Sequence, residues 1–211
     1  MFVGLTGGIS CGKSTVSQMF VSKGCVLVDS DQLAREVVNP GSPALEEIAT
    51  YFGQEVLTAK GELHREKLGE IIFGNHEARK KLESIIHPKI RTRTQQQIMQ
   101  FEEENPSRLT IVDVPLLYEV HMENMFPEVI VVYCPQTMQI DRLMERDNLS
   151  HEQATQRIQA QMPIEEKRKK ADVLIDNSKT LEHTMEQVEL LLNDDDWKRS
   201  IMEKSSLILQ K

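Results

Sequence analysis

Five short runs of the chain are apolar at nearly every position and are rich in β-branched and aliphatic residues. Because polar residues do not alternate with apolar ones inside them, the runs are typical of strands covered on both faces of a parallel sheet. Segments with helical signals separate the runs, so the pattern predicts an α/β fold with a five-stranded parallel sheet. The runs are residues 2–6, 25–29, 109–113, 129–133 and 172–176.

Capping signals mark where some of the helices begin. Ser42 is followed by Pro43, which suits the first helical position, and Ser150 with Gln153 forms a capping-box pattern. We expect helices directly after Ser42 and Ser150, and another that begins near Lys13, behind the first strand.

Two long stretches without a strand-like run divide the chain. Residues 32–108 are too long for a simple crossover, and we expect them to form a helical substrate-binding insertion. Residues 136–171 are dense in Arg and Lys and are expected to form a helical lid. The other segments are then a core of residues 1–31, 109–135 and 172–193, and a C-terminal extension of residues 194–211 with no assigned role.

Composition narrows the classes of partner. The 211-residue chain has a net charge of −8, which disfavours nucleic acid and anionic membranes. Its longest apolar run, residues 129–134, is too short to cross a bilayer. Three cysteines without C-x-x-C spacing indicate reduced thiols. We therefore expect a cytoplasmic protein that binds neither nucleic acid nor membrane. The sequence does not fix the oligomeric state, for which a monomer or a weak homo-oligomer is the expectation.

The turn after the first run, G-G-I-S-C-G-K-S at residues 7–14, fits the phosphate-binding pattern G-x-x-x-x-G-K-[ST]. Its glycines let successive N–H groups point at phosphate oxygens, and the next helix adds its positive end. Lys13 would reach the β and γ phosphates, and Ser14 would offer a hydroxyl to Mg²⁺. The alternatives fit less well: a plain glycine turn with an exposed lysine, and a dinucleotide site, in which Ile9 would have to be glycine. The turn predicts ATP with Mg²⁺.

Acidic residues end two of the expected strands. Asp29 and Asp31 would share a face if the strand continues, and ligands bind at that edge of a parallel sheet. One of them is expected to act on a substrate hydroxyl and the other to cap the next helix. Asp113 follows an apolar run, as in a Walker B segment, which predicts a magnesium ligand or an ordinary loop aspartate.

The chain lacks the segments that mark a signalling GTPase. It contains no N-K-x-D sequence, and Asp113 is followed by Val-Pro instead of the glycine of a D-x-x-G switch. A small-molecule kinase fits better than a nucleotide switch.

The expected lid supplies candidate cations. Arg142 and Arg146 are four residues apart and lie on one helix face, where a mobile arginine would neutralise a transferring phosphate. Ion pairs with Glu145 or Asp147 are the alternative. Outside the lid, His87 precedes a proline that is expected to end a helix, which would fix the imidazole beside a substrate cleft. A purely structural role for His87 is the alternative. The other lid cations are Arg157, Lys167, Arg168, Lys169 and Lys170.

Taken together, these segments resemble the dephospho-CoA kinase family over about residues 1–193. The family implies a nucleoside-monophosphate-kinase-like fold and transfer of phosphate from ATP to the ribose 3′-hydroxyl of dephospho-CoA. The matching segments are Leu5–Ile9, the loop through Thr15, Val28–Asp31 with Ala34–Arg35, His87–Pro88, Val114–Glu119, Arg142, Arg146–Asp147 and Asp176–Asn177.

The resemblance also implies roles for single residues. Asp31, Lys13 and Arg142 would be catalytic, and Asn177 would lie near the adenine. Asp31, Arg35, His87 and Leu116 would contact the acceptor, and Ser14 and Asp113 would hold the metal. The residues implied to bind ATP are Gly8, Ile9, Ser10, Cys11, Gly12, Lys13, Ser14, Thr15 and Asn177.

One departure concerns the loop itself. Ser10-Cys11 stands where the family often has Gly-Ser, which would place a thiol against the nucleotide. Oxidation or alkylation of Cys11 is then expected to block ATP binding by filling the phosphate cradle. Other hypotheses stay open on sequence grounds: a kinase of another small acceptor, such as a nucleoside monophosphate or shikimate, and a nucleotide-binding regulator without catalysis.

Overall fold

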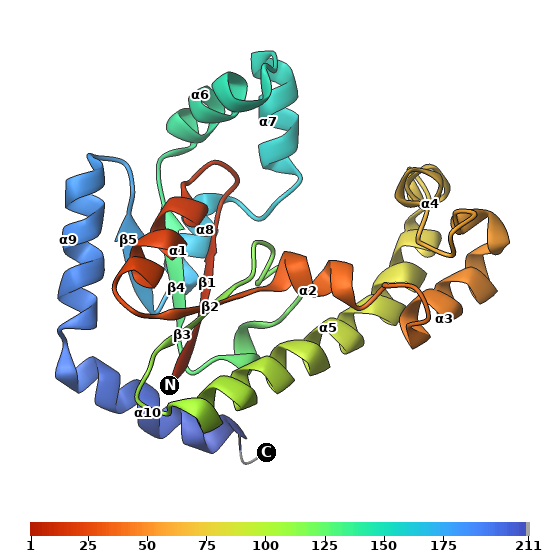
Figure 1. Ribbon diagram of the computed structural model, residues 1–211. Helices are drawn as coiled ribbons and strands as arrows, with labels where there is room; N and C mark the ends of the chain where they lie inside the picture. The colour runs from red at the N-terminus through yellow and green to blue at the C-terminus, as the bar shows by residue number, and fades with distance from the viewer. Residues whose placement is uncertain (210–211) are drawn as a thin grey trace. The chain divides into compact units, whose positions relative to one another are not determined.

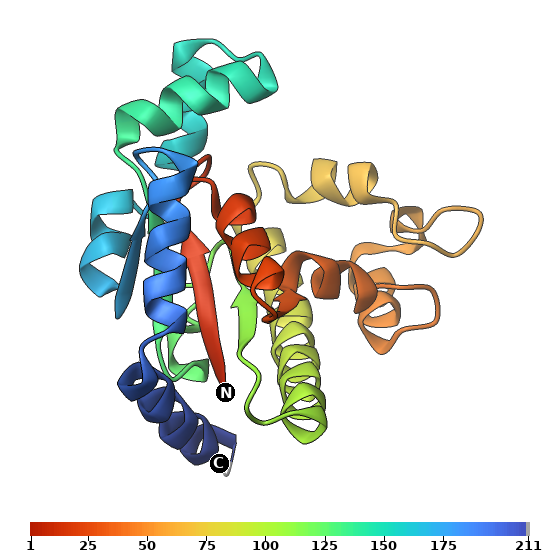
Figure 2. The same cartoon turned by 60° about the vertical axis from the view of Figure 1, so that its left-hand side comes forward.

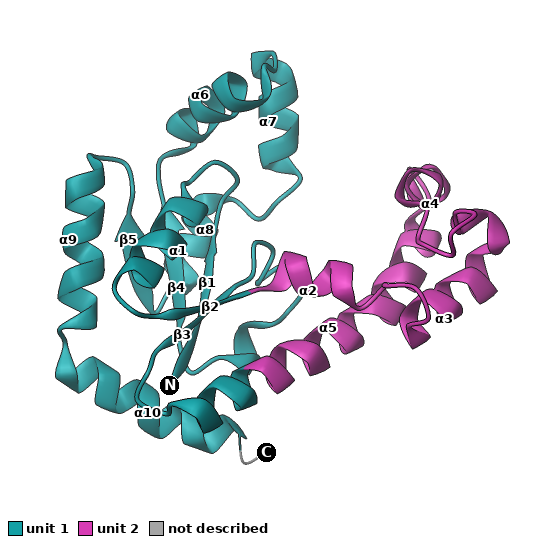
Figure 3. Ribbon diagram, viewed as in Figure 1, with its two compact units in different colours: residues 1–28, 98–211 teal, residues 29–97 magenta. Residues whose placement is uncertain are grey.

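The computed structural model describes residues 1–209 of the chain and divides it into two compact units (Figure 3). The first unit comprises residues 1–28 and 98–211, and the second comprises residues 29–97. The second boundary falls inside a helix at residues 97–98, whereas the sequence placed the end of the insertion at residue 108. Within residues 1–209 no helix has both the length and the apolar character needed to cross a bilayer.

A five-stranded parallel sheet forms the centre of the first unit, in the order β2-β3-β1-β4-β5 (Figure 1). Leu5 in the central strand pairs with Asp113 on one side and Ile130 on the other, and all three are largely buried. All five predicted strands are present, with ends that agree within one residue. They are β1 (Phe2–Gly7), β2 (Val26–Asp29), β3 (Thr110–Asp113), β4 (Val129–Tyr133) and β5 (Val173–Asp176).

Helices cover both faces of this sheet (Figure 2). The connection from β1 to β2 runs one way along the sheet and that from β4 to β5 runs the other way, so right-handed crossovers place α1 and α8 on opposite faces. Helix α9 packs beside α1 and against β5. The helices of this unit that follow the strands are α1 (Lys13–Ser22), α6 (Gln136–Asp147), α7 (His151–Gln159), α8 (Ile164–Lys170), α9 (Leu181–Leu192) and α10 (Asp195–Leu209).

The C-terminal extension supports the start of the central strand. Ser205 in α10 is buried, and its hydroxyl accepts a hydrogen bond of 3.2 Å from the backbone N–H of Phe2. Trp197 donates its indole N–H to Glu128 at 2.8 Å. These contacts give residues 195–209 a structural role that the sequence had left open, and residues 210–211 lie outside the described part.

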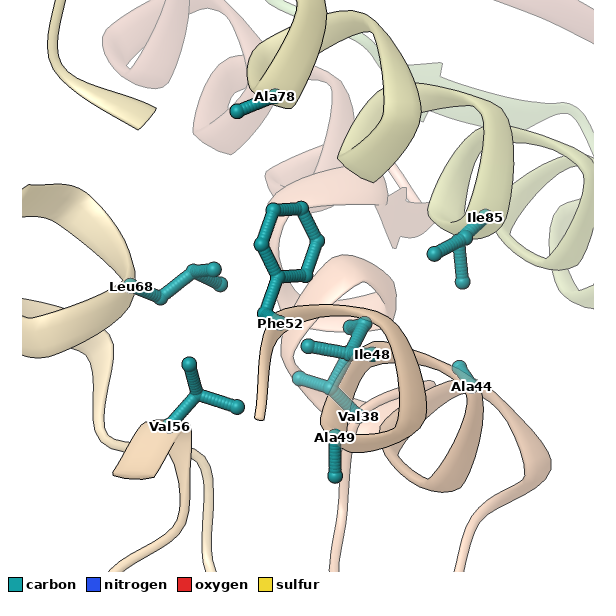
Figure 4. Close-up of a cluster of buried hydrophobic side chains, with 9 residues drawn as sticks. All are labelled: Val38, Ala44, Ile48, Ala49, Phe52, Val56, Leu68, Ala78 and Ile85. Atoms are coloured by element: carbon teal, nitrogen blue, oxygen red, sulfur yellow. The ribbon is translucent and has the colours of Figure 1, made fainter. Parts of the chain in front are cut away.

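The second unit is helical and has its own hydrophobic core (Figure 4). Ser42 caps α3 by accepting from the N–H of Leu45 at 3.2 Å, as its sequence predicts. The buried side chains are Val38, Ala44, Ile48, Ala49, Phe52, Val56, Leu68, Ala78 and Ile85. The elements are α2 (Ser30–Glu36), α3 (Pro43–Phe52), a 3₁₀ turn (Gln54–Val56), α4 (Arg65–Ile72) and α5 (His76–Glu104), whose last turns belong to the first unit.

Helix α5 continues through Pro88, contrary to the expected helix boundary. An internal proline removes one hydrogen bond and costs about 3 kcal/mol. Burial on both sides of it explains why the helix persists, because Ile85 packs in the second unit's core and Ile90 is also buried. In the same turn, Lys89 donates its ammonium to the carbonyl of Ile85 at 3.2 Å. Tertiary packing here outweighs the local signal.

Candidate functional site

The loop between β1 and α1 forms one wall of a cavity of about 440 Å³ at the carboxyl edge of the sheet. Its backbone takes two left-handed residues, Ser10 with φ 59° and Gly12 with φ 84°. At Gly12 a side chain is excluded twice, by that φ and because a Cβ would lie 2.1 Å from the amide nitrogen of Asn177. The cavity is lined by Gly7, Gly8, Ile9, Ser10, Gly12, Lys13, Ser14, Thr15, Pro115, Arg142, Arg146 and Gln161.

The charge of this cavity is opposite to that of the whole chain. Its charged lining residues are Lys13, Arg142 and Arg146, whereas the chain has a net charge of −8. Three cations around a loop of backbone N–H groups, at the start of a helix, make a local site for a multiply charged anion.

Lys13 is held at the cavity by an ion pair with Asp113 at the end of β3. Both side chains are mostly buried, at 15% and 11% exposure. Because β1 and β3 are neighbours in the sheet, their ends bring the loop lysine and the strand-end acid together. The structure thus joins two of the residues that the sequence predicted separately.

Two glutamines from the expected lid hold the tip of the loop. Gln139 in α6 donates its amide to the carbonyl of Ile9 at 2.7 Å, and Gln161 accepts from the N–H of Ile9 at 3.1 Å. A Cβ on Gly8 would lie 2.2 Å from the Gln139 amide, so this glycine gives the glutamine its room. Sequence reasoning missed both glutamines. Gln139 did carry a signal, because it lies four residues before the apolar Leu143 on the buried face of the helix.

Asn177, directly after β5, fixes the other side of the loop. Its amide donates to the carbonyl of Cys11 at 2.8 Å and accepts from the hydroxyl of Thr184 at 2.9 Å. Arg142 donates to its backbone carbonyl at 3.0 Å. Asn177 also lines a second cavity, of about 420 Å³, with Ser10, Gly12, Thr15, Arg142, Lys179, Thr180 and Leu181.

A fully buried lysine supports the loop through hydrogen bonds to backbone carbonyls. Lys167 in α8 donates to the carbonyls of Gly7 and Pro115 at 3.3 and 3.2 Å, and pairs with Glu119 at 2.9 Å. Glu119 also accepts from the N–H of Met162 at 2.9 Å. The sequence placed Lys167 among the lid cations and gave no sign that it is buried. Burial is set by packing of α8 against β4, which nothing in a four-residue basic run reveals.

Replacing Lys167 by methionine is expected to lower the free energy of unfolding by about 3 kcal/mol, because the Glu119 carboxylate then lacks its buried partner. Chemical denaturation measures this loss. Lys169→Met is the matched control on the exposed side of α8, and it should stay close to the parent. Adding Glu119→Gln to Lys167→Met should restore part of the stability, and no restoration would argue against the pair as the cause.

The remaining lid arginines form surface ion pairs. Arg146 pairs with Asp147 at 2.8 Å, and Arg157 pairs with the same carboxylate at 2.7 Å. The two guanidinium groups lower the pKa of Asp147, with Arg146 the larger cause. Arg142 differs, because it donates to a backbone carbonyl and lines both cavities.

The two candidate aspartates near β2 have separate roles. Asp29 is the N-cap of α2, and its carboxylate accepts from the N–H of Asp31 at 2.8 Å and of Gln32 at 3.1 Å. The expected shared strand face is wrong, because the chain turns helical at Ser30. Asp31 is exposed in the first turn of the helix and free of the capping role. The sequence left open which of the two aspartates caps the helix, and the structure shows that it is Asp29.

The thiol of Cys11 does not face the cavity, contrary to the expectation that it would lie against a nucleotide. Its side chain is fully buried, and its Sγ lies 3.5 Å from that of Cys134. The backbone N–H of Cys11 donates to the carbonyl of Gly8 at 3.1 Å, and Cys11 is absent from the lining of both cavities. An oxidised or alkylated Cys11 would therefore not simply fill the phosphate cradle.

The other predicted acceptor contacts lie in different parts of the chain. Leu116 follows β3 in the first unit and is 40% exposed. Arg35 is exposed in α2, and His87 is half-buried in α5, where burial lowers its pKa. Both belong to the second unit, so their part in one site with Lys13 stays a prediction.

The candidate metal ligands are oxygen donors. Ser14 lines the cavity and Asp113 borders it through Lys13. A hydroxyl and a carboxylate are the hard ligands that Mg²⁺ takes, usually with waters and substrate phosphates completing the shell. Among residues 1–209 no cluster of three or more His, Cys, Asp or Glu side chains is placed to hold a metal by itself. The donor set therefore fits a metal that arrives with a phosphorylated ligand.

Comparison with known sequences gives a consistent result. A family model described as dephospho-CoA kinase matches residues 1–183. The dephospho-CoA kinase of Bacillus licheniformis is 45% identical over 92% of this chain and 96% of the relative. That of Carboxydothermus hydrogenoformans is 42% identical over 93% of this chain and 95% of the relative.

Solved structures agree in fold. The dephospho-CoA kinase of Campylobacter jejuni superposes with a TM-score of 0.71 at 34% identity, over 92% of this chain and 97% of the other. A protein from Thermus thermophilus superposes with a TM-score of 0.75 at 32% identity and the same two coverages.

Proposed function

The chain belongs to the dephospho-CoA kinase family, and on that premise we propose that it transfers the γ-phosphate of ATP to the ribose 3′-hydroxyl of dephospho-CoA. The products are coenzyme A and ADP, so the reaction is the last step of coenzyme A synthesis. The observation that carries the proposal is the phosphate-binding loop with Lys13, Arg142 and Arg146 around one cavity of an otherwise acidic protein.

ATP is proposed to bind with its phosphates in the 440 Å³ cavity and its adenosine toward the 420 Å³ cavity. Ser10, Gly12, Thr15 and Arg142 line both cavities, which supports one ligand that extends through the two. Asn177 lines only the second, consistent with a place near the adenine. Among the other predicted ATP contacts, Cys11 would act through its backbone alone, because its side chain is buried.

Lys13 is proposed to bind the β and γ phosphates and Arg142 to neutralise charge as the phosphoryl group moves. Ser14 and Asp113 would hold Mg²⁺, which supplies further charge compensation on the phosphate oxygens when bound. Phosphoryl transfer depends chiefly on alignment and charge compensation, because its transition state is loose. Three buried side chains hydrogen-bond to the loop and hold it in the conformation that this alignment needs. They are Lys167, Gln139 and Asn177.

Asp31 is proposed to accept the proton of the attacking hydroxyl. Its carboxylate is exposed at the first turn of α2 and is not used as a cap, because Asp29 fills that role. Arg35, His87 and Leu116 are proposed to contact the acceptor, and the lid is proposed to close over the bound ATP. Closure would exclude water and so limit hydrolysis of ATP.

A coupled assay of ADP formation tests the proposed function. We expect ADP to form with ATP, Mg²⁺ and dephospho-CoA, and far more slowly when nucleoside monophosphates or shikimate replace the acceptor. Analysis of the product should show the new phosphate on the 3′-oxygen. Binding of ATP without acceptor-dependent release of ADP would instead favour a nucleotide-binding regulator.

Gln161→Met is expected to raise the KM for ATP about fivefold, the value of one hydrogen bond of ~1 kcal/mol, with kcat little changed. The variant removes the acceptor for the N–H of Ile9 and loosens the tip of the loop. Steady-state kinetics with varied ATP and saturating dephospho-CoA measure the effect. Gln159→Met, two residues away and exposed, is the control, and an equal change in both variants would contradict the role of Gln161.

A further inference from the structure

Two buried thiols meet directly beside the phosphate-binding loop. Cys11 belongs to the loop and Cys134 follows β4, and their Sγ atoms lie 3.5 Å apart although 123 residues separate them in sequence. Both side chains are fully buried, and neither lines the two cavities. The proposed phosphate transfer therefore makes no use of this pair of thiols.

We propose that Cys11 and Cys134 form a redox-modification site, at which a peroxide converts the two thiols into a disulfide and so lowers the affinity of the loop for nucleotide. The separation of their sulfur atoms is that of a sulfur-to-sulfur hydrogen bond, and a disulfide requires about 2.05 Å. A contraction of about 1.5 Å in the observed 3.5 Å separation would make the bond. The disulfide itself does not depend on the proposed function, whereas its effect on ATP binding rests on that function.

The surroundings shift the pKa values of the two thiols in opposite directions. The contact with the Cys11 sulfur and the Arg142 guanidinium lower the pKa of the Cys134 thiol, and burial and Asp176 oppose them. The same contact and burial raise the pKa of Cys11. We assign the attack on the oxidant to Cys134, which has the Arg142 guanidinium as a neighbour, and the closing of the disulfide to Cys11.

The chemistry balances with hydrogen peroxide as the oxidant. The Cys134 thiolate attacks one peroxide oxygen, the oxygen–oxygen bond breaks, and hydroxide departs as the leaving group. Cys134 is then a sulfenic acid. The Cys11 sulfur then attacks that sulfur, the sulfur–oxygen bond breaks, and the Cys11 proton leaves with the oxygen as water. The hydroxide takes up the proton that Cys134 had released. Two thiols and one peroxide thus give a disulfide and two waters, with two electrons passing from sulfur to oxygen.

A disulfide here would act on the loop at its most constrained point. Cys11 lies between the left-handed residues Ser10 and Gly12, and its carbonyl is held by Asn177. Its backbone N–H is also held by the carbonyl of Gly8 at 3.1 Å. Drawing Cys11 toward the end of β4 therefore shifts the N–H groups of the loop away from the phosphate positions.

The test uses the full natural chain treated with hydrogen peroxide, quenched with catalase and mapped as peptides without reduction. We expect a Cys11–Cys134 cross-linked peptide and a free Cys25, which is buried elsewhere and whose pKa burial raises to about 11. The oxidised protein should bind a fluorescent ATP analogue at least tenfold more weakly, and dithiothreitol should restore binding.

Two variants separate the pair from other oxidation. Cys134→Ala should keep its ATP binding after peroxide, and Cys25→Ala should remain as sensitive as the parent. Irreversible oxidation without the cross-linked peptide would overturn the proposal, as would a cross-linked protein that binds the analogue with undiminished affinity. If Cys134→Ala does not fold, the peptide map and the dithiothreitol reversal of the natural chain still decide. If the natural reduced chain binds no ATP at all, the proposed function fails while the peptide map still reports on the disulfide.

Discussion

Replacing Lys13 by methionine is expected to lower kcat by about 10²–10³-fold, the range for removing one preorganised donor from a transition state, and to raise the KM for ATP. The Lys13 side chain lines the cavity, is 15% exposed and pairs with Asp113. Methionine keeps the length of the side chain but supplies neither charge nor donor to the phosphates. Steady-state kinetics with varied ATP measure both constants, and thermal unfolding checks that the variant folds.

The control for this prediction is Lys23→Met. Lys23 follows α1 and pairs on the surface with Glu189, so its loss should leave kinetics and stability near those of the parent. A Lys13→Met enzyme that keeps the parent's kcat would remove the lysine from the proposed mechanism. A variant that loses kcat but not ATP affinity would place its action in the transition state alone.

The strands and the loop could be predicted from the sequence because their signals are local. Continuous apolar runs fix the buried strands, and the glycines and lysine at residues 7–14 fix the turn between the first strand and its helix. Hydrophobic patterning of this kind depends on burial on both faces, which a parallel sheet provides along its whole length. The capping signals at Ser42 and Ser150 were also confirmed, because a cap is satisfied within one turn of its own helix.

The supports of the loop could not be predicted in the same way, because they depend on contacts between distant segments. Cys11 and Cys134 are 123 residues apart, and only the order of the strands brings them together. Lys167 differs from its basic neighbours in being buried, with Gly7, Pro115 and Glu119 as its partners. Helix α5 continues through Pro88 because the residues on both sides of the proline are packed. Residue type alone predicts that a charged or polar side chain lies on the surface, so it gives the wrong location for those that are buried.

The roles of the two aspartates at the end of β2 could be predicted only in part from the sequence. Sequence reasoning predicted one cap and one functional group, and the hydrogen bonds of Asp29 show which is the cap. The capping hydrogen bonds therefore distinguish the two aspartates, which their spacing in the sequence could not do. The proposed role of Asp31 follows by exclusion and by family resemblance, and its test needs a variant that changes chemistry without changing the helix.

Asp31→Asn is expected to lower kcat by about 10²–10⁴-fold, the usual contribution of a positioned acid or base, while the KM for ATP stays near that of the parent. Asparagine has nearly the same shape as aspartate but cannot take the proton of the attacking hydroxyl. The side chain is exposed and makes no cap, so stability should not change. Kinetics with each substrate varied in turn separate the loss of kcat from any loss of binding.

Asp29→Asn is the matched control, with the same substitution two residues earlier on the same helix. Asparagine caps helices as well as aspartate does, so this variant should keep its stability and most of its kcat. The contrast between the two variants isolates proton transfer from helix capping and from a general loss of negative charge near α2. If Asp29→Asn were the slower enzyme, the catalytic carboxylate would be the cap itself, and Asp31 would have to be reassigned to binding or to the surface.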